Sequence, residues 1–156
     1  MKNVYIYDSP IGKILIADNG EKITNIYFKD ETFIKEDWKV NETELIKKTY
    51  NELIEYFNGK RKSFDIPLAP IGTEFQMKCW KALQEIPYGE TKTYGEIAEI
   101  IGNPKASRAV GSSNNKNPIS IIIPCHRVIG ANGKLVGYAG GLHVKEYLLN
   151  LERRVL

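Results

Sequence analysis

The sequence is poor in the residue types that most often form metal centres and covalent cross-links. Its 156 residues include only two cysteines, Cys79 and Cys125, and two histidines. Two cysteines are too few for a disulfide framework, and together with two histidines they offer no spacing typical of a zinc site. We therefore expect neither a metal nor a cofactor, and the chemistry open to Cys125 is that of a free thiol.

Long hydrophobic runs are also absent. No apolar stretch approaches the roughly 18 residues of a membrane-spanning helix, and the first residues lack the apolar core of a signal peptide. With 42% hydrophobic residues, the chain can still build a packed core without cross-links. We expect a cytoplasmic protein that is monomeric in solution and has no membrane partner.

A strong charge imbalance is the third feature that the sequence lacks. The net charge is +3, with 13 basic and 15 acidic residues in 1–90, but six basic and two acidic residues in 91–134. Such a modest local excess is more often a solvated surface than a nucleic-acid site. It indicates DNA binding only if a recognisable motif lies in the same stretch.

Two patterns organise the first half. Residues 3–28 contain three short apolar runs separated by turn-forming residues, which predicts a small antiparallel meander. At Asn41 the period becomes helical, with Glu44 completing a capping box and Asn58-Gly59 ending the helix. The apolar stripe expected to cover the meander is Leu45, Ile46, Tyr50, Leu53, Ile54 and Phe57.

A linker separates this half from the next. Residues 59–72 combine a basic cluster with two prolines and two glycines, which is typical of a connection between compact units. We place the boundary near Pro70, with domains at 1–70 and 71–156. The predicted fold is α+β: a small antiparallel sheet domain with a covering helix, followed by a mainly helical, winged-helix-like domain.

Helix signals dominate the second half. Capping boxes predict helix starts at Thr73 and Thr93, and Asn103-Pro104 predicts a third start. The second and third helices, separated by a turn containing Gly102, form a helix-turn-helix candidate. Its outward side chains are expected to be Arg108, Ser112 and Asn114, and the apolar face of a closing helix is expected to be Val144, Tyr147, Leu148 and Leu151.

The pentapeptide Pro124–Val128 places a nucleophile beside a base. A cysteine thiol is mostly protonated near neutral pH, so attack on carbon needs a neighbouring imidazole or cation, and His126 and Arg127 follow Cys125 directly. The alternative is that Cys125 is simply a buried packing residue. Pro124 constrains the backbone where an apolar strand, Ile119–Ile123, is expected to end, which favours a positioned side chain.

In this order, the motifs of the second half resemble those of the O6-alkylguanine-DNA alkyltransferases, DNA repair proteins also called methylated-DNA–protein-cysteine methyltransferases. The resemblance runs from about Phe75 to Leu151. It rests on six blocks: Thr93–Ala98, Gly102–Ala106, Arg108–Gly111, Asn117-Pro118, Pro124–Val128 and Tyr138–Leu142. The first half is only loosely similar to the family's N-terminal, RNase H-like domain.

The resemblance implies how double-stranded DNA containing O6-alkylguanine is bound. The helix-turn-helix docks in the minor groove, Arg108 enters the base stack, and Tyr94 presses on a neighbouring phosphate while the damaged base rotates outward. The remaining DNA contacts are expected from Ala106, Ala109, Ser112 and Asn114. The walls of the base pocket are expected to be Pro124, Val128, Tyr138, Ala139 and Gly140.

The resemblance also implies the chemistry. Cys125 attacks the alkyl carbon, His126 takes the thiol proton through a water, and Glu146 orients His126. Tyr94 donates a proton to the departing purine, and Asn117 braces the turn that holds the cysteine. Because a thioether does not readily revert to a thiol, the protein reacts once. O4-alkylthymine is a second candidate substrate.

Two departures and two rival functions remain. Residues 1–78 contain no cysteine or histidine, so the zinc site of some relatives is absent, and Ala139 replaces a serine found in others. A non-catalytic, alkyltransferase-like DNA-binding protein lacks the reactive cysteine, so Cys125 argues against that class. A Cys-His hydrolase would instead transfer acyl groups with repeated turnover.

Overall fold

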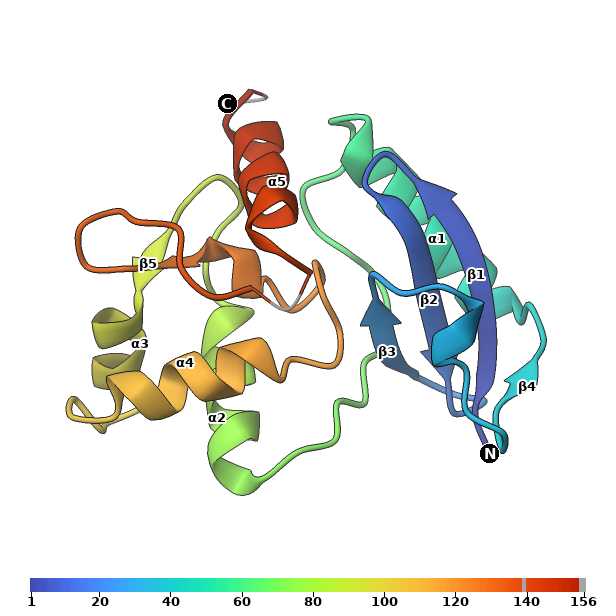
Figure 1. Ribbon diagram of the computed structural model, residues 1–156, viewed down its shortest axis with the longest axis horizontal. Coiled ribbons are helices and arrows are strands. Elements are labelled where there is room, and N and C mark those ends of the chain that lie inside the picture. Colours follow the sequence, from blue (N-terminus) through green and yellow to red (C-terminus); the bar gives the residue numbers. More distant parts are fainter. Residues whose placement is uncertain (139, 155–156) are drawn as a thin grey trace. The chain divides into compact units, whose positions relative to one another are not determined.

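The computed structural model describes residues 1–138 and 140–154. Its contacts divide the chain into two compact units, Met1–Ile71 and a second that begins at Gly72 (Figure 1). In the part of the chain described, none of the helices has the length and apolar character needed to cross a membrane. Each unit combines helices with strands, and the predicted α+β class is confirmed.

The sheet of the first unit is mixed, not purely antiparallel as predicted. Its strand order is β3-β2-β1-β4, with antiparallel pairing among the first three strands. A fourth strand pairs parallel to β1 through only two residues, both exposed, which leave no apolar pattern in the sequence. The strands are β1 (Asn3–Ser9), β2 (Gly12–Asp18), β3 (Ile23–Tyr27) and β4 (Lys39–Val40).

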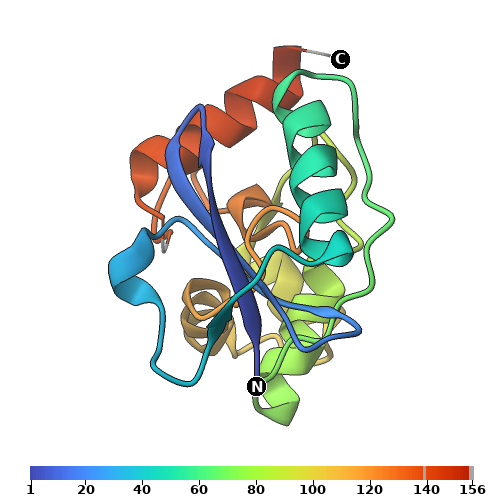
Figure 2. The same cartoon turned by 90° about the vertical axis from the view of Figure 1, so that its right-hand side faces the viewer.

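The central strand β2 is covered on both faces. Leu15 and Ala17 pack in a cluster with Val4, against which Ile34 and Trp38 lie. Since successive strand side chains point to opposite faces, Ile14 and Ile16 face the other side, where α1 (Glu44–Phe57) runs along the sheet (Figures 1 and 2). The sheet of this unit therefore has buried apolar side chains on both of its faces.

Helix α1 starts two residues later than predicted. Thr43 is its N-cap and accepts a hydrogen bond from the Ile46 amide at 3.1 Å. Asn41 instead continues the pairing of β4 with β1: its backbone amide donates to the Val4 carbonyl at 3.0 Å, and its side chain donates to Asn3 at 3.2 Å. The predicted end is correct: Asn58 is the C-cap, and Gly59 adopts a positive φ of 73°.

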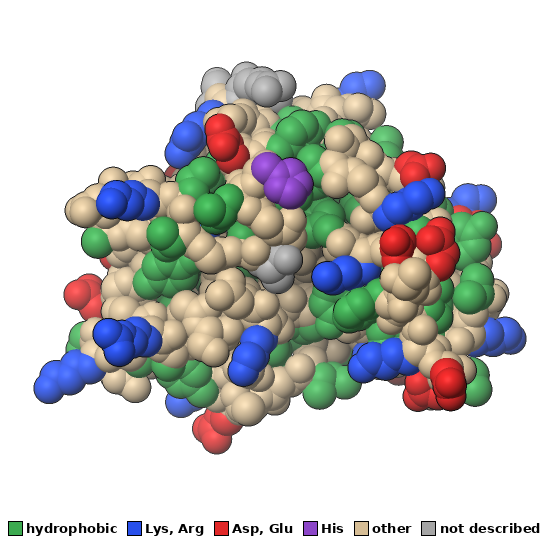
Figure 3. All heavy atoms as spheres, viewed as in Figure 1, with side chains coloured by type: hydrophobic (Ala, Val, Ile, Leu, Met, Phe, Trp, Pro, Cys, Tyr) green, Lys and Arg blue, Asp and Glu red, His purple; other side chains and the backbone are tan. Residues whose placement is uncertain are grey.

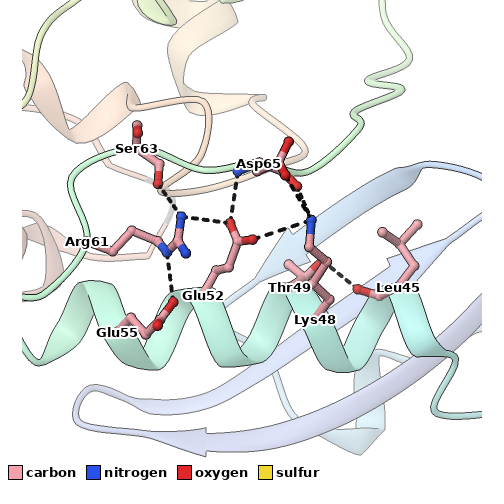
Figure 4. Close-up of polar contacts among 8 residues, drawn as sticks. All are labelled: Leu45, Lys48, Thr49, Glu52, Glu55, Arg61, Ser63 and Asp65. Carbon is pink, nitrogen blue, oxygen red and sulfur yellow. Dashed lines mark hydrogen bonds and ion pairs between the residues drawn. The ribbon is translucent and has the colours of Figure 1, made fainter.

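A buried carboxylate connects α1 to the segment that leaves this unit. Glu52 accepts a hydrogen bond from the Asp65 amide at 2.9 Å and lies 3.5 Å from both the Lys48 and the Arg61 nitrogens (Figure 4). Arg61 also donates to Glu55 at 2.9 Å. The linker predicted from composition is therefore pinned to the helix by directed contacts.

Replacing Glu52 with alanine should lower the free energy of unfolding by about 1–3 kcal/mol, because the Asp65 amide loses its acceptor and two cations lose their shared partner. Denaturant unfolding followed by circular dichroism measures this change. Glu55→Ala, which removes an exposed carboxylate of the same network, is the matched control and should shift stability by less than about 0.5 kcal/mol. Equal effects of the two substitutions would contradict the central role of Glu52.

The second unit is mainly helical. Both predicted capping boxes are present: Thr73 with Gln76 starts α2, and Thr93 with Glu96 starts α3. A two-residue strand, β6, pairs parallel to β5 and joins the segment after Cys125 to the start of α3. The elements are α2 (Glu74–Leu83), β5 (Lys92–Thr93), α3 (Tyr94–Ile100), α4 (Ser107–Asn115), the 3₁₀ helix η2 (Cys125–Arg127), β6 (Val128–Ile129) and α5 (Leu142–Arg154).

Two secondary-structure predictions for this unit are wrong. The second helix of the helix-turn-helix begins at Ser107, not at Asn103-Pro104, because the Asn103 carbonyl closes a turn with the Ala106 amide at 3.0 Å. The run Ile119–Ile123 is not a strand: Ile121 has a φ of 72°, and the Ile123 amide bonds the Ile119 carbonyl at 3.0 Å. Turns within the run and the side chain of Asn117 bond several of its backbone groups.

Candidate active site

Cys125 begins η2 and is 2% exposed. Asparagines at the end of α4 and just beyond it hold the backbone on both sides of the thiol. Asn114 donates to the Cys125 carbonyl at 3.2 Å, and Asn117 donates to the Ile123 carbonyl at 2.8 Å and accepts from the Ile119 amide at 3.0 Å. Side-chain amides thus replace the strand pairing that would otherwise mount the cysteine.

Asn114 was predicted to point outward toward DNA, and this is wrong. Its side chain is 2% exposed and faces the active-site loop. The helical period explains the difference, because Asn114 lies one turn after the buried Val110. The exposed face of α4 carries Arg108, Ala109 and Ser112 instead.

The thiol of Cys125 is held in its protonated form. Burial raises its pKa, while hydrogen bonds with Asn117 and Tyr138 and the positive charge of Lys145 offset that rise only in part. Attack by sulfur therefore requires that a base remove the proton as the reaction begins.

The base beside Cys125 is His126, and its carboxylate partner is Glu152. The His126 Nε2 atom lies 2.6 Å from Glu152 Oε2, and both side chains are buried. Burial lowers the pKa of His126, and Glu152 raises it only in part, so the imidazole is neutral near pH 7. With Nε2–H donating to the carboxylate, Nδ1 carries the lone pair, and this buried atom has no hydrogen-bond partner among the described residues.

Glu146 was predicted to orient His126, and this is wrong, since its side chain is exposed on α5. The signal that favours Glu152 is present in the sequence. Glu152 follows Val144 and Leu148 at intervals of four residues, so it lies on the buried face, whereas Glu146 is out of phase with that stripe.

Arg127 shares the same carboxylate. Its Nε and Nη2 atoms donate to the two oxygens of Glu152 at 2.9 and 3.1 Å, and Nη1 donates to the Ile86 carbonyl at 2.7 Å. The Gly89 amide also donates to Glu152 at 3.1 Å. Burial alone would raise the pKa of Glu152, but His126 and Arg127 outweigh it and hold that pKa well below its usual range.

Tyr94 and Lys145 approach the site from α3 and α5. The Tyr94 hydroxyl donates to the Val136 carbonyl at 2.8 Å, and burial raises the pKa of Tyr94, so the hydroxyl stays protonated. Lys145 is fully buried, and its Nζ donates to the same carbonyl at 2.9 Å. The sequence signal for its burial was its position on the same helix face as Leu148 and Glu152, but lysine as a residue type is expected to be exposed.

The other predicted site residues fall into two groups. Pro124, Val128 and Tyr138 are buried: the first two lie close to Cys125 in the sequence, and Tyr138 forms a hydrogen bond with its thiol. Ala106 and Gly140 are half-buried. Ala139 lies outside the described residues. Within residues 1–138 and 140–154, no group of three or more His, Cys, Asp or Glu side chains is arranged to hold a metal ion.

The geometry predicts opposite outcomes for the two glutamates of α5. Glu152→Gln leaves Arg127 buried beside a neutral partner and should lower the free energy of unfolding by about 3 kcal/mol. Glu146→Gln, the same change at an exposed position on the same helix, should alter it by less than about 0.5 kcal/mol. Thermal and denaturant unfolding of both variants measure the difference, and a similar small loss in each would refute the assignment of Glu152.

Comparison with known families matches both units. The model of the 6-O-methylguanine DNA methyltransferase DNA-binding domain matches residues 74–154, and that of the ribonuclease-like domain matches residues 4–70. A methylated-DNA–protein-cysteine methyltransferase of Methanosarcina acetivorans is 59% identical over 150 residues, covering 94% of this chain and 96% of that protein. The constitutive enzyme of Bacillus subtilis is 44% identical, covering 94% of this chain and 92% of its own length.

Solved structures agree with the sequence matches. The O6-methylguanine methyltransferase of Mycobacterium tuberculosis superimposes with a TM-score of 0.93 at 45% identity, covering 100% of this chain and 95% of that chain. The M. tuberculosis protein OGT in complex with DNA has a TM-score of 0.92 at 46% identity, covering 98% of this chain and 94% of that chain. As the ordered motifs of its second half predicted, the chain belongs to the methylated-DNA–protein-cysteine methyltransferase family, the O6-alkylguanine-DNA alkyltransferases.

Proposed function

We propose that this protein, a DNA repair methyltransferase of that family, removes the alkyl group from O6-alkylguanine in double-stranded DNA and keeps it on Cys125. The observation that carries the assignment is the buried Cys125 directly followed by His126, whose ring is oriented by Glu152 at 2.6 Å. The reaction occurs once per molecule because the product is a thioether. No step requires a metal or cofactor.

The atoms balance without a co-reactant. The Cys125 sulfur forms a bond to the alkyl carbon as the bond from that carbon to O6 breaks, and the electron pair remains on guanine. His126 accepts the thiol proton at Nδ1 through a bridging water, while guanine gains one proton from Tyr94 and leaves as the neutral base. The imidazolium then releases its proton to water, and a proton from water restores the Tyr94 hydroxyl, so no proton is gained or lost overall. Glu152 stabilises the imidazolium that forms, although Arg127 neutralises part of its charge.

Tyr94 supplies the donor for the departing purine. The raised pKa of Tyr94 keeps its hydroxyl protonated. From the start of α3, this hydroxyl donates to the Val136 carbonyl. When a base enters, this hydroxyl exchanges its protein acceptor for the purine edge. Among the described residues, the pocket proposed around that edge includes Pro124, Val128, Tyr138 and Gly140.

DNA reaches the site through α4. The exposed face carries Arg108, Ala109 and Ser112 with Ala106 before it, while the opposite face holds the cysteine loop through Asn114. Small side chains allow the helix to lie in the minor groove, and Arg108 fills the space left by the extruded nucleotide. On the face drawn in Figure 3, Lys and Arg side chains are scattered among other residues and form no broad basic patch. This favours DNA contact through α4 over contact through a wide charged surface.

We propose that the partner is damaged double-stranded DNA and that the protein acts in the cytoplasm as a monomer. The two rivals make different predictions. A non-catalytic damage-binding protein leaves Cys125 unmodified, and a Cys-His hydrolase turns over acyl substrates repeatedly. O4-alkylthymine in place of O6-methylguanine tests the second candidate substrate in the same assay.

Intact-mass spectrometry after mixing with duplex DNA containing O6-methylguanine tests the proposal. We expect one methyl group per protein molecule, located on Cys125 by peptide mapping, with the same amount of guanine restored in the DNA. Cys125→Ser should abolish the mass change, whereas Cys79→Ser should retain it because Cys79 is packed in α2. An unchanged mass of the wild-type protein would reject the assignment.

Arg108→Ala should slow methyl transfer from paired O6-methylguanine by about tenfold or more, because extruding a stacked base costs a few kcal/mol. The loss should be smaller when the target base is mispaired or in single-stranded DNA, where less stacking is disrupted. Single-turnover kinetics on the three substrates measure this gradient. Arg153→Ala removes an exposed arginine on α5 and is the control; an equal loss on all three substrates would argue against insertion of Arg108.

A further inference from the structure

Lys145 is an uncommon feature of the buried site. Its side chain is fully buried, yet among the ion pairs of the described residues none includes it. Its Nζ atom instead donates to two backbone carbonyls, Val136 at 2.9 Å and Gly137 at 3.4 Å. Burying an ammonium group without an anion is costly, so its retention at this place needs a reason beyond packing.

The Val136 carbonyl has two donors. The Tyr94 hydroxyl approaches it at 2.8 Å and the Lys145 ammonium at 2.9 Å, and that ammonium also lies 5.8 Å from the centre of the Tyr94 ring. A carbonyl oxygen has two lone pairs and can accept both bonds together. Lys145 therefore contacts both the acceptor that Tyr94 uses now and Tyr94 itself.

The Tyr94 hydroxyl has the 136–137 segment and α4 as its neighbours. A β-carbon on Gly137 would lie 3.7 Å from the Tyr94 hydroxyl and 3.4 Å from the Asn115 side chain. On α4, a β-carbon on Gly111 would lie 3.9 Å from the Tyr94 ring. The hydroxyl thus sits between the 136–137 segment and α4, and a shift of that segment would move it.

The exchange of hydrogen bonds at Tyr94 leaves Lys145 as the remaining protein donor to the Val136 carbonyl. When the Tyr94 hydroxyl turns to a purine, it gives up its bond to this carbonyl, and the Lys145 ammonium at 2.9 Å stays in place. With Lys145 in position, the carbonyl keeps one donor throughout. The segment also keeps its anchor to α5.

We propose that Lys145 is a positioning residue that holds the Val136 carbonyl so that the Tyr94 hydroxyl is free to transfer from the protein to the extruded base. Lys145 itself touches neither the base nor the alkyl group. The inference rests on the proposed role of Tyr94 in the function above. It predicts that the contribution of Lys145 to the rate depends on the Tyr94 hydroxyl.

A double-mutant cycle between Lys145→Met and Tyr94→Phe tests this dependence. Single-turnover transfer from O6-methylguanine duplex DNA is measured as a maximal rate and a half-saturating DNA concentration. We expect Lys145→Met alone to lower the maximal rate by about tenfold, with the half-saturating concentration within about twofold, since the anchor acts on the transfer step. In the Tyr94→Phe background, the same substitution should change the rate by less than about threefold.

Equal losses in both backgrounds would overturn the proposal, because a general loss of packing or a direct effect of charge on the thiol does not need the Tyr94 hydroxyl. Lys81→Met, an exposed lysine on α2, is the matched control and should leave the rate unchanged. Circular dichroism and thermal unfolding establish that each variant folds. If Lys145→Met does not, Lys145→Arg retains a cationic donor and should keep the rate within about threefold of wild type; a Tyr94-independent loss there also overturns it.

These measurements distinguish a failure of the proposed function from a failure of the role of Lys145. If the wild-type protein takes no methyl group from the DNA, the proposed function fails. If the wild type is methylated on Cys125 and the effects of Lys145→Met and Tyr94→Phe multiply, only the role of Lys145 fails.

Discussion

The carboxylate of Glu152 is the contact on which the second unit depends. It joins three segments far apart in the sequence: α5, which carries it, η2 through His126 and Arg127, and the turn after α2 through the Gly89 amide. An isolated buried carboxylate would be strongly unfavourable, but here several donors surround it. The arrangement converts a costly charge into a fixed position for the imidazole.

This position explains how a buried thiol can react without being permanently ionised. Both cysteines of the chain are buried, and burial raises the pKa of each thiol. Cys79 has the Ser113 side chain beside it, whereas Cys125 has a neutral imidazole next in sequence and oriented by a carboxylate. In the proposed reaction, the reactivity of Cys125 therefore comes from the neighbours of the thiol and not from a low pKa, and the buried sulfur is sheltered before the alkyl group arrives.

Local signals in the sequence were sufficient where the structure is decided locally. The capping boxes at Thr73 and Thr93 predicted two helix starts because each is completed within four residues. Asn41 is not the helix cap, because its backbone and its side chain both pair with β1, which is far away in the sequence. The two-residue β4 gives no periodic pattern at all, so no sequence argument would have placed it.

The site residues divide in the same way. The order of the motifs predicted the family and Cys125 with His126, because these residues are adjacent in the chain. The choice of Glu152 over Glu146 required the phase of α5, which the buried stripe contained but the analogy with the family did not use. Asn114 was assigned to DNA by its place in the helix-turn-helix, although its phase with Val110 points inward.

In the proposed function, helix α4 is the element that connects the DNA contact to the reactive cysteine. Its nine residues span only about 13 Å at 1.5 Å per residue, yet Arg108 is exposed at one end and Asn114 supports the Cys125 carbonyl at the other. The Trp80 indole fixes the helix to α2 by donating to the Ser113 carbonyl at 2.8 Å. Because a short helix moves as a rigid body, docking through Arg108 in the proposed complex would leave little freedom in the position of the Cys125 sulfur. In the proposed complex, the position of the extruded base and the position of the Cys125 sulfur are thus set by one short, anchored helix.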